Sequence, residues 1–487
     1  MSVPQDLQGY FQQFQQHIIG EDQFFDAGYG PQPLIYADAS GRLYQPIEEL
    51  ICKKIAPKFA NTHSFSSETG KFTTYLYQFA RKTIKEHVNA GSDDILVATG
   101  SGMTAALSKL QRLMGLKGFG LDKKRIPEKE RPVVFISEME HHSNHVSWME
   151  TIAEVVIVPA GSGALIDPEF LEKELQNYAE RPMKIGAFTA CSNVTGLITN
   201  YKELARIMHR HGGYCFIDFA ASAPYVAIDM HPNDTDYLDA IFFSPHKFLG
   251  GPGSSGVLIF NRQLYKVSCP DNPGGGNVKW TSPDGRYSYV DDVEVKEDGG
   301  TPGILQVIRV CLAIQLKEKM GVENIQKREA ALLSQCYRKL IKIPGIYILG
   351  NTSLPRIGCI SFTIEGIHYN LMVRLLNDRF GIQVRGGWSC ASTYAHSLFR
   401  ITSEKSNKIL EAIDGKDLTE KPGWVRLSLH PTLSDEKLDM ICASIAEVQQ
   451  NYETWKNDYA YNQGTNEFES IKNPDDYALE IQSVFEI

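Results

Sequence analysis

A single lysine in the middle of the 487-residue chain stands between an apolar run and a glycine-rich turn. Residues 244–256 (Ser-Pro-His-Lys-Phe-Leu-Gly-Gly-Pro-Gly-Ser-Ser-Gly) follow the apolar run 240–243. An amine at Lys247 could attack an aldehyde cofactor, and Ser244 and His246 could donate hydrogen bonds to the phosphate of that cofactor. An ordinary exit from a strand into a loop, with a solvated lysine, fits these residues equally well.

A second candidate is the stretch 100–104 (Gly-Ser-Gly-Met-Thr), which follows an apolar run and opens a helical pattern. Glycines let the backbone approach a ligand, and free N–H groups at a helix start bind anions. Ser101 and Gly102 are therefore candidate anion-binding residues. The stretch has neither the Gly-Lys-Ser/Thr of a P-loop nor a Gly-x-Gly-x-x-Gly fingerprint, and a tight turn without a ligand remains an alternative.

Two more polar residues lie at or just beyond the ends of apolar runs. Asp218 ends one run, at the carboxyl edge where open α/β sheets bind ligands. A carboxylate there is costly without a cationic partner, which a protonated pyridine nitrogen would supply; a helix cap is the alternative. Asn193 follows another run, within Cys-Ser-Asn-Val-Thr-Gly.

Paired histidines occur in the stretch 140–144, Glu-His-His-Ser-Asn. Adjacent residues rarely face one ion, and no third ligand has a suitable spacing, so we predict no metal site here. We favour an imidazole, His141, stacked on a flat cofactor.

Three residues near the C-terminal end could act on an amino-acid substrate. Arg385 and Arg426 are isolated arginines suited to a bidentate carboxylate contact, although a surface salt bridge is the commoner role. Cys390 lies in a glycine-bearing loop with a basic neighbour, where a thiol could be exposed and partly ionised. An inert loop cysteine fits this local sequence equally well.

The elements that would position these residues alternate between short apolar runs and amphipathic helices. Apolar strands separated by helices predict an α/β fold with a mostly parallel sheet covered on both faces. The expected strands are 95–98, 132–136, 155–159, 185–189, 214–218, 240–244 and 256–260.

Beyond residue 303 a buried helix is expected at 304–316, and the strands become sparser, which indicates a smaller α+β domain. We expect an N-terminal segment (1–33) that packs with the small domain, and a large domain (34–303) that binds the cofactor. The small C-terminal domain (304–455) and an acidic, aromatic tail (456–487) with little periodicity would follow.

Composition narrows the class of protein. The net charge of −9 gives no reason to expect nucleic acid or an anionic membrane as a partner. No apolar run approaches the ~20 residues of a membrane helix, and residues 1–19 lack a signal-peptide pattern. Nine cysteines without framework spacing favour a reducing compartment, so we expect a cytoplasmic protein.

Taken in order, these stretches resemble the fold-type I pyridoxal-phosphate enzymes of the class V aminotransferase superfamily, from about residue 34 to about residue 449. They are most similar to its cysteine desulfurase and selenocysteine lyase branch. The resemblance implies that Lys247 is the Schiff-base lysine and that Asp218 pairs with the pyridinium nitrogen. His141 would stack on the ring, and Asn193 would lie near the phenolic oxygen and the substrate.

The resemblance also implies a phosphate site and a homodimer. Ser101 and Gly102 fall in the phosphate-binding turn, and Ser244 and His246 would add donors. Residues 299–303 (Gly-Gly-Thr-Pro-Gly) are similar to the family turn whose threonine, here Thr301, reaches the phosphate across a dimer interface.

For the reaction, Arg426 matches the arginine that binds the substrate carboxylate. Cys390, in the same loop as Arg385, falls where the desulfurases carry their sulfur-accepting cysteine. The implied activity removes sulfur or selenium from L-cysteine or a related amino acid, giving alanine and a persulfide on Cys390, with a sulfur-acceptor protein as a partner. The alternative is another class V enzyme, an aminotransferase, epimerase or C–S lyase, in which Cys390 is not catalytic.

The chain departs from the family pattern in four places. Trp388 and Ser389 precede Cys390, where the branch often has histidine. In addition, Ala221 stands where a glutamine is usual, the segment between Cys390 and Arg426 is longer, and the acidic tail has no counterpart. These departures leave the substrate open without affecting the expected use of the cofactor.

Overall fold

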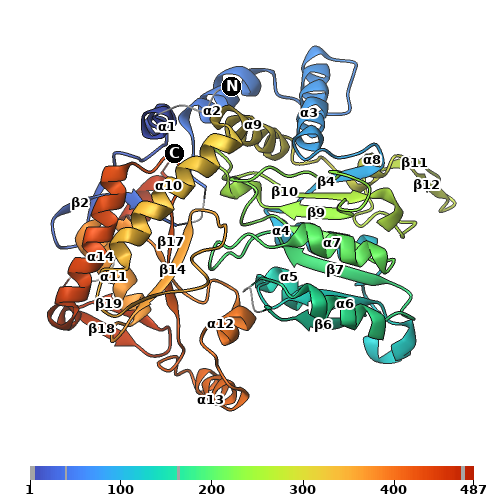
Figure 1. Ribbon diagram of the computed structural model, residues 1–487. Helices are drawn as coiled ribbons and strands as arrows, with labels where there is room; N and C mark the ends of the chain where they lie inside the picture. Colours follow the sequence, from blue (N-terminus) through green and yellow to red (C-terminus); the bar gives the residue numbers. More distant parts are fainter. Residues whose placement is uncertain (1–5, 39–40, 162–164, 473–477, 487) are drawn as a thin grey trace. The chain divides into compact units, whose positions relative to one another are not determined.

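The computed structural model describes the chain except for residues 1–5, 39–40, 162–164, 473–477 and 487 (Figure 1). The chain forms two compact units. Unit 1 comprises Met1–Ile19, Ala39–Arg328 and Ser353–Ile357, and unit 2 comprises Gly20–Asp38, Glu329–Thr352 and Gly358–Ile487. None of the described helices is both long and apolar enough to cross a membrane.

Unit 1 is built on a seven-stranded sheet in the order β4-β10-β9-β8-β7-β5-β6. All seven strands lie within a residue or two of the runs predicted from the sequence: β4 (Asp94–Thr99), β5 (Val133–Ser137), β6 (Glu154–Val158), β7 (Lys184–Thr189), β8 (Tyr214–Asp218), β9 (Ala240–Phe243) and β10 (Gly256–Asn261). Only β10 runs against its two neighbours, so the prediction of a mostly parallel sheet is confirmed.

The helices of unit 1 connect and cover these strands (Figure 1). Local capping explains where several of them begin: the Asp167 side chain accepts hydrogen bonds from the first turn of α6, and proline occupies its first position. The helices are α1 (Leu7–Gln15), α2 (Gln45–Leu50), α3 (Glu68–His87), α4 (Met103–Leu113), α5 (His142–Met149), α6 (Pro168–Asn177), α7 (Tyr201–Arg210), α8 (Val293–Glu297) and α9 (Ile304–Met320).

Two further parts of unit 1 lie outside this pattern. A hairpin of β11 (Val278–Thr281) and β12 (Tyr287–Tyr289) interrupts the long connection between β10 and α8. Helix α1 contributes to an apolar cluster with residues of α2 and α9, in which Phe11 and Phe14 are buried.

Unit 2 contains a four-stranded antiparallel sheet in the order β13-β14-β17-β16. Its strands are β13 (Ile346–Ile348), β14 (Cys359–Ile364), β16 (Arg385–Gly387) and β17 (Trp424–Ser428). One apolar core joins β14 and β17 to α11 (Tyr369–Phe380), α14 (Asp435–Trp455) and the part of α10 (Val322–Leu340) from Glu329 onward.

Short elements complete unit 2. Strands β1 (Phe24–Asp26) and β2 (Pro31–Pro33) pair with each other, and β3 (Ile35–Tyr36) pairs in parallel with β15 (Ile382–Gln383). The segment between Cys390 and Arg426 contains α12 (Ser392–Leu398) and α13 (Ser403–Asp414), and α15 (Ala478–Val484) lies in the tail.

The acidic tail also forms a hairpin of β18 (Tyr459–Asn462) and β19 (Glu467–Ser470), which the sequence had not indicated. The reason is tertiary: Tyr459 is buried in the core of unit 2, and its hydroxyl donates to Asp378 Oδ2 at 3.0 Å. Strands of four residues are too short for a clear alternating pattern.

Candidate active site

The Lys247 turn is a tight backbone structure at the end of β9. Residues Pro245–Lys247 form a single 3₁₀ turn in which Lys247 N–H donates to Ser244 O at 3.0 Å. The turn requires glycine at position 251, because a Cβ there would lie 1.9 Å from Pro245 O. The glycines after the lysine therefore shape the backbone that holds a half-buried amine.

Asp218 lies at the same edge of the sheet, because β8 and β9 are parallel neighbours that both end there. Only 3% of Asp218 is exposed, and Oδ1 accepts a hydrogen bond from Ala220 N–H at 2.8 Å. Burial raises its pKa to about 6, although the Ala220 N–H and the positive charge of Lys247 oppose the shift. The raised pKa means that little positive charge surrounds the carboxylate, so a cationic ring nitrogen would stabilise its charged form.

The anion-binding turn and the lysine turn are bonded to each other. Met103 N–H, at the start of α4, donates to Ser244 Oγ at 2.9 Å, and His246 Nδ1 lies 2.7 Å from Ser101 O. Gly102 is needed at this contact, since a Cβ there would lie 2.9 Å from the His246 ring. The Ser244 hydroxyl accepts from Met103, so its own hydrogen remains available to a ligand.

A cavity of about 660 Å³ adjoins these residues. Its lining includes Ser101, His246, Ser254 and Thr301. Ser254 is 4% exposed, and its Oγ has no hydrogen-bond partner among the described residues. A buried hydroxyl without a partner among the described residues, near the start of α4, fits a phosphate. Ser254 belongs to the same stretch as Lys247, residues 244–256, but the sequence alone could not show that its hydroxyl lacks a partner among the described residues.

His141 caps the start of α5, where its Nδ1 accepts Ser143 N–H at 3.1 Å. Nε2 therefore carries the proton in the neutral ring, and the ring orientation is set by the helix. The neighbouring Glu140, which our sequence reasoning did not select, is buried and bonded to the ends of β5 and β7 and to α5. It accepts from Ser137 Oγ at 2.5 Å, Asn144 Nδ2 at 2.7 Å and Thr189 N at 2.9 Å.

Burial raises the pKa of Glu140 to about 8, so its charge is costly unless these donors remain in place. Asn193 lies in the loop that leaves β7, and the start of this loop is bonded to β8 through Ala190 N–H and Asp218 O at 2.9 Å. Asn193 and Ala221 are both half-buried. The described residues contain no cluster of three or more side chains suited to a metal ion.

The remaining candidates lie in unit 2, on its sheet. Arg385 on β16 and Arg426 on β17 are paired across the two strands; Arg385 is exposed and Arg426 is buried. Arg426 forms an ion pair with Asp38 Oδ1 at 2.8 Å. The sequence did not indicate Asp38, because 388 residues separate it from its partner. The ion pair with Asp38 thus shows that the Arg426 guanidinium can bind a carboxylate.

Cys390 is exposed and follows β16 in a strained turn. Ser389 and Cys390 both adopt left-handed backbone conformations, with φ of 49° and 57°. The turn is anchored to β17, because Trp424 Nε1 donates to Ser389 Oγ at 3.2 Å. A thiol on a fixed and exposed turn is accessible to a reacting molecule. The left-handed conformations of Ser389 and Cys390 cost energy, so the contacts around the turn must hold it in place.

The structure therefore gathers the candidates in two groups, one in each unit. Unit 1 brings Lys247, Asp218, the Ser101–Gly102 turn, Asn193 and His141 to one edge of a sheet. Unit 2 brings Arg385, Arg426 and Cys390 to neighbouring strands and their connection.

A family model described as "Aminotransferase class-V" matches residues 37–441, a range that includes every candidate residue of both groups. The chain belongs to the class-V aminotransferase family. It is therefore an enzyme of that superfamily, and the hairpin β18–β19 lies beyond the part that matches the family.

Curated relatives of this class-V protein carry a more specific name. A probable cysteine desulfurase of Halalkalibacterium halodurans is 30% identical over 366 residues, which are 74% of this chain and 84% of the relative. A probable cysteine desulfurase of Staphylococcus aureus is 28% identical over 381 residues, covering 77% of this chain and 87% of the relative.

Solved structures share the fold. An apo cysteine desulfurase from Thermococcus onnurineus aligns with a TM-score of 0.72 at 21% identity, over 93% of this chain and 99% of that one. The cysteine desulfurase CsdA from Escherichia coli aligns with a TM-score of 0.70 at 21% identity, over 90% of this chain and 98% of that one. At this identity the match supports the α/β architecture of the class-V fold.

Proposed function

We propose that this class-V enzyme is a pyridoxal-phosphate-dependent cysteine desulfurase-like protein. It would remove sulfur or selenium from L-cysteine or a related amino acid, giving alanine and a persulfide on Cys390. The observation that carries the proposal is the buried Asp218, whose pKa is raised to about 6 at the edge that also holds Lys247. The names of the curated relatives support the choice of substrate.

The residues of unit 1 fit the cofactor. Asp218 would hold the ring nitrogen in its protonated form, His141 would cover one face of the ring and Asn193 would meet the phenolic oxygen. The phosphate would be bound by side chains and N–H groups of Ser101, Gly102, Ser244, His246 and Ser254. Bound pyridoxal phosphate supplies an electron sink for negative charge at the substrate Cα.

The chain's own residues would carry out the remaining work. Arg426, with Arg385 beside it, binds the substrate carboxylate, and the Lys247 amine takes the proton from Cα. The Cys390 thiolate attacks the substrate sulfur, so an S–S bond forms as the Cβ–S bond breaks and its electron pair stays with the carbon fragment. Protonation of that fragment gives alanine, and the persulfide on Cys390 is ready for an acceptor protein.

Release of alanine from L-cysteine, followed with a mass-spectrometric search for a persulfide on Cys390, tests this function. We expect a Cys390→Ser protein to bind the cofactor as the wild type does and to lose alanine formation from cysteine. If the serine variant makes alanine at the wild-type rate, the sulfur-transfer step is wrong and an aminotransferase, epimerase or C–S lyase reaction replaces it. A Lys247→Ala protein should lose the near-visible absorbance of the bound cofactor.

We also propose a cytoplasmic homodimer in which Thr301 reaches the partner's phosphate site. Thr301 lines the same cavity as Ser101 of its own chain, so the contact has to be assigned by experiment. Mixed dimers of a Thr301→Val chain with a Lys247→Ala chain contain one site with a lysine. That site should bind the cofactor normally if the threonine comes from the partner, and weakly if it comes from the same chain.

A further inference from the structure

Three carboxylates immediately precede the Thr301 turn, and each is bonded to a cation on another helix. Glu294 and Glu297 lie on α8, and Asp298 follows it. The residues between Asp298 and the start of α9 belong to no helix or strand. The position of Thr301 therefore depends on contacts made by the residues around it.

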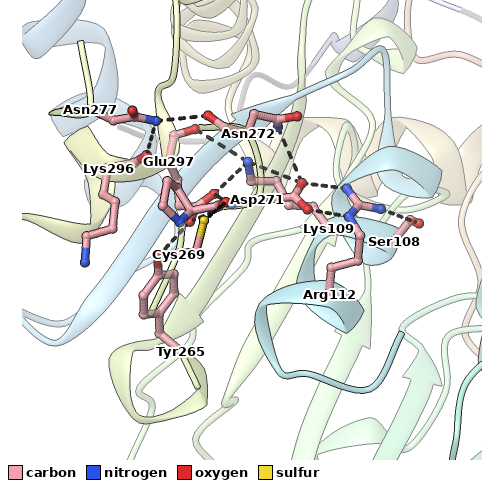
Figure 2. Close-up of polar contacts among 11 residues, drawn as sticks. Ser108, Lys109, Arg112, Tyr265, Cys269, Asp271, Asn272, Asn277, Lys296 and Glu297 are labelled. Atoms are coloured by element: carbon pink, nitrogen blue, oxygen red, sulfur yellow. Dashed lines mark hydrogen bonds and ion pairs between the residues drawn. The ribbon is translucent and has the colours of Figure 1, made fainter. Parts of the chain in front are cut away.

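The first tether joins α8 to α4. Lys109 is 2% exposed, and its Nζ lies 2.9 Å from Glu297 Oε2 and 3.7 Å from Asp271 Oδ2 (Figure 2). Glu297 also accepts Tyr265 Oη–H at 2.8 Å. Arg112, one turn further along α4, bonds Asp271 through Nε and Nη2 at 2.5 and 2.7 Å.

The second tether joins α8 and the residue after it to α3. Arg81 Nη1 lies 3.1 Å from Asp298 Oδ2, and Nη2 lies 2.9 Å from Glu294 Oε2. Tyr77 Oη donates to Asp298 Oδ2 at 2.8 Å. The guanidinium also donates to Leu96 O at 2.7 Å, so it is bonded to β4 as well.

A third set of contacts joins the turn to the loop 272–277, which follows Asp271. Gly300 N–H donates to Gly275 O at 2.8 Å, and a Cβ at Gly299 would lie 2.2 Å from Asn272 O. Asn277 Nδ2 donates to Asn272 O at 2.9 Å and Lys296 O at 3.1 Å (Figure 2). The glycines of the turn thus pack directly against a loop that Asn277 closes.

These buried ion pairs are weak evidence for stability, because removing charges from water costs about as much as their attraction returns. These ion pairs do fix geometry, because the two charged side chains of a pair keep their hydrogen bonds in only a few relative arrangements. Helix α4 begins at the Ser101–Gly102 turn, and Lys109 is on the same helix. The Lys109–Glu297 pair therefore links the helix of one anion-binding turn to the Thr301 turn, and both turns line the 660 Å³ cavity.

We infer that Lys109 and Arg81 are positioning residues that hold the Thr301 turn as a phosphate-binding element, through Glu297 and Asp298 respectively. The inference rests on the proposed function, since the anion in question is the phosphate of pyridoxal phosphate. It holds whether the turn serves its own chain or the partner subunit.

The test compares two ligands that differ only in the phosphate. Pyridoxal phosphate and pyridoxal share the aldehyde and the ring, so the ratio of their dissociation constants isolates the phosphate contribution. We expect Lys109→Met and Arg81→Met to weaken pyridoxal phosphate binding by about tenfold or more, the effect of losing a charge-assisted hydrogen bond. Pyridoxal binding should change by less than about threefold.

The matched control is Lys82→Met, one residue after Arg81 on α3, where the lysine side chain is 73% exposed and pairs only with Glu86 in the described chain. It should leave the ratio unchanged. Because Lys109→Met leaves Glu297 without its cation, a Lys109→Met/Glu297→Gln double variant removes both charges while the glutamine can still accept from Tyr265. It should regain thermal stability and keep the altered ratio, with faster hydrogen exchange in residues 298–303.

An unchanged ratio in folded Lys109→Met and double-variant proteins would overturn the inference, because their turns would then bind phosphate without the tether. Equal weakening of pyridoxal phosphate and pyridoxal would overturn it as well, since the network would then have only a general structural role. If the wild-type protein fails to bind pyridoxal phosphate, the proposed function itself is wrong.

Discussion

Replacing Asp218 by asparagine should have opposite effects on the empty protein and on the cofactor complex. The carboxyl pKa is raised from 3.8 to about 6 in the folded chain, because the group is buried. Between these values the folded chain binds more protons than the unfolded chain, so stability falls as pH rises. This rise in pKa corresponds to about 3 kcal/mol of destabilisation at pH 7.5.

Asparagine removes this cost and retains an oxygen for the Ala220 N–H. Urea unfolding of cofactor-free Asp218→Asn at pH 7.5 should therefore show an unfolding free energy up to about 3 kcal/mol above that of the wild type, falling to about half of that gain at pH 5. The same variant should bind pyridoxal phosphate more weakly and lose alanine formation, because the ring nitrogen loses its anionic partner.

The matched control is Glu329→Gln in unit 2, where burial raises the pKa of another carboxyl to about 8. This variant should also stabilise the cofactor-free protein, without affecting cofactor binding. The reasoning is refuted if cofactor-free Asp218→Asn is less stable than the wild type at pH 7.5, or if its advantage does not shrink on acidification.

Three other outcomes follow from the same site. Ser254→Ala should leave the unfolding free energy of the cofactor-free protein unchanged or slightly higher, since no described residue bonds the hydroxyl. Calorimetric titration should show about tenfold weaker pyridoxal phosphate binding. Gly251→Ala should lose the cofactor absorbance and lower the melting temperature, because the new Cβ would lie 1.9 Å from Pro245 O; normal absorbance would contradict the described turn. Burial lowers the pKa of His246, and a bound phosphate dianion should raise it, so cofactor affinity should decrease as pH rises, and His246→Gln should remove that part of the pH dependence.

Local sequence was sufficient for the parts of the site that depend on neighbours in the chain. Apolar runs separated by helical patterns predicted all seven strands of the large sheet, and parallel strands bring their carboxyl ends to one edge. Lys247 and Asp218 therefore had to lie near each other once their strands were adjacent. Glycines at 102 and 251 similarly lie in turns where an added Cβ would be crowded, by the His246 and Ser244 side chains at 102 and by backbone at 251.

Only the tertiary structure shows which residues far apart in the sequence form hydrogen bonds or ion pairs. No local pattern pairs Arg426 with Asp38, Lys109 with Glu297 or Tyr459 with Asp378, because each pair is brought together by the packing of separate elements. The same limit applies to Ser254 and Glu140: whether a buried polar group is satisfied depends on the atoms that surround it in space. The sequence by itself determined which residues could bind the cofactor, through local turns and strand ends. Tertiary packing decided their hydrogen bonds and charges, because burial and long-range contacts set both.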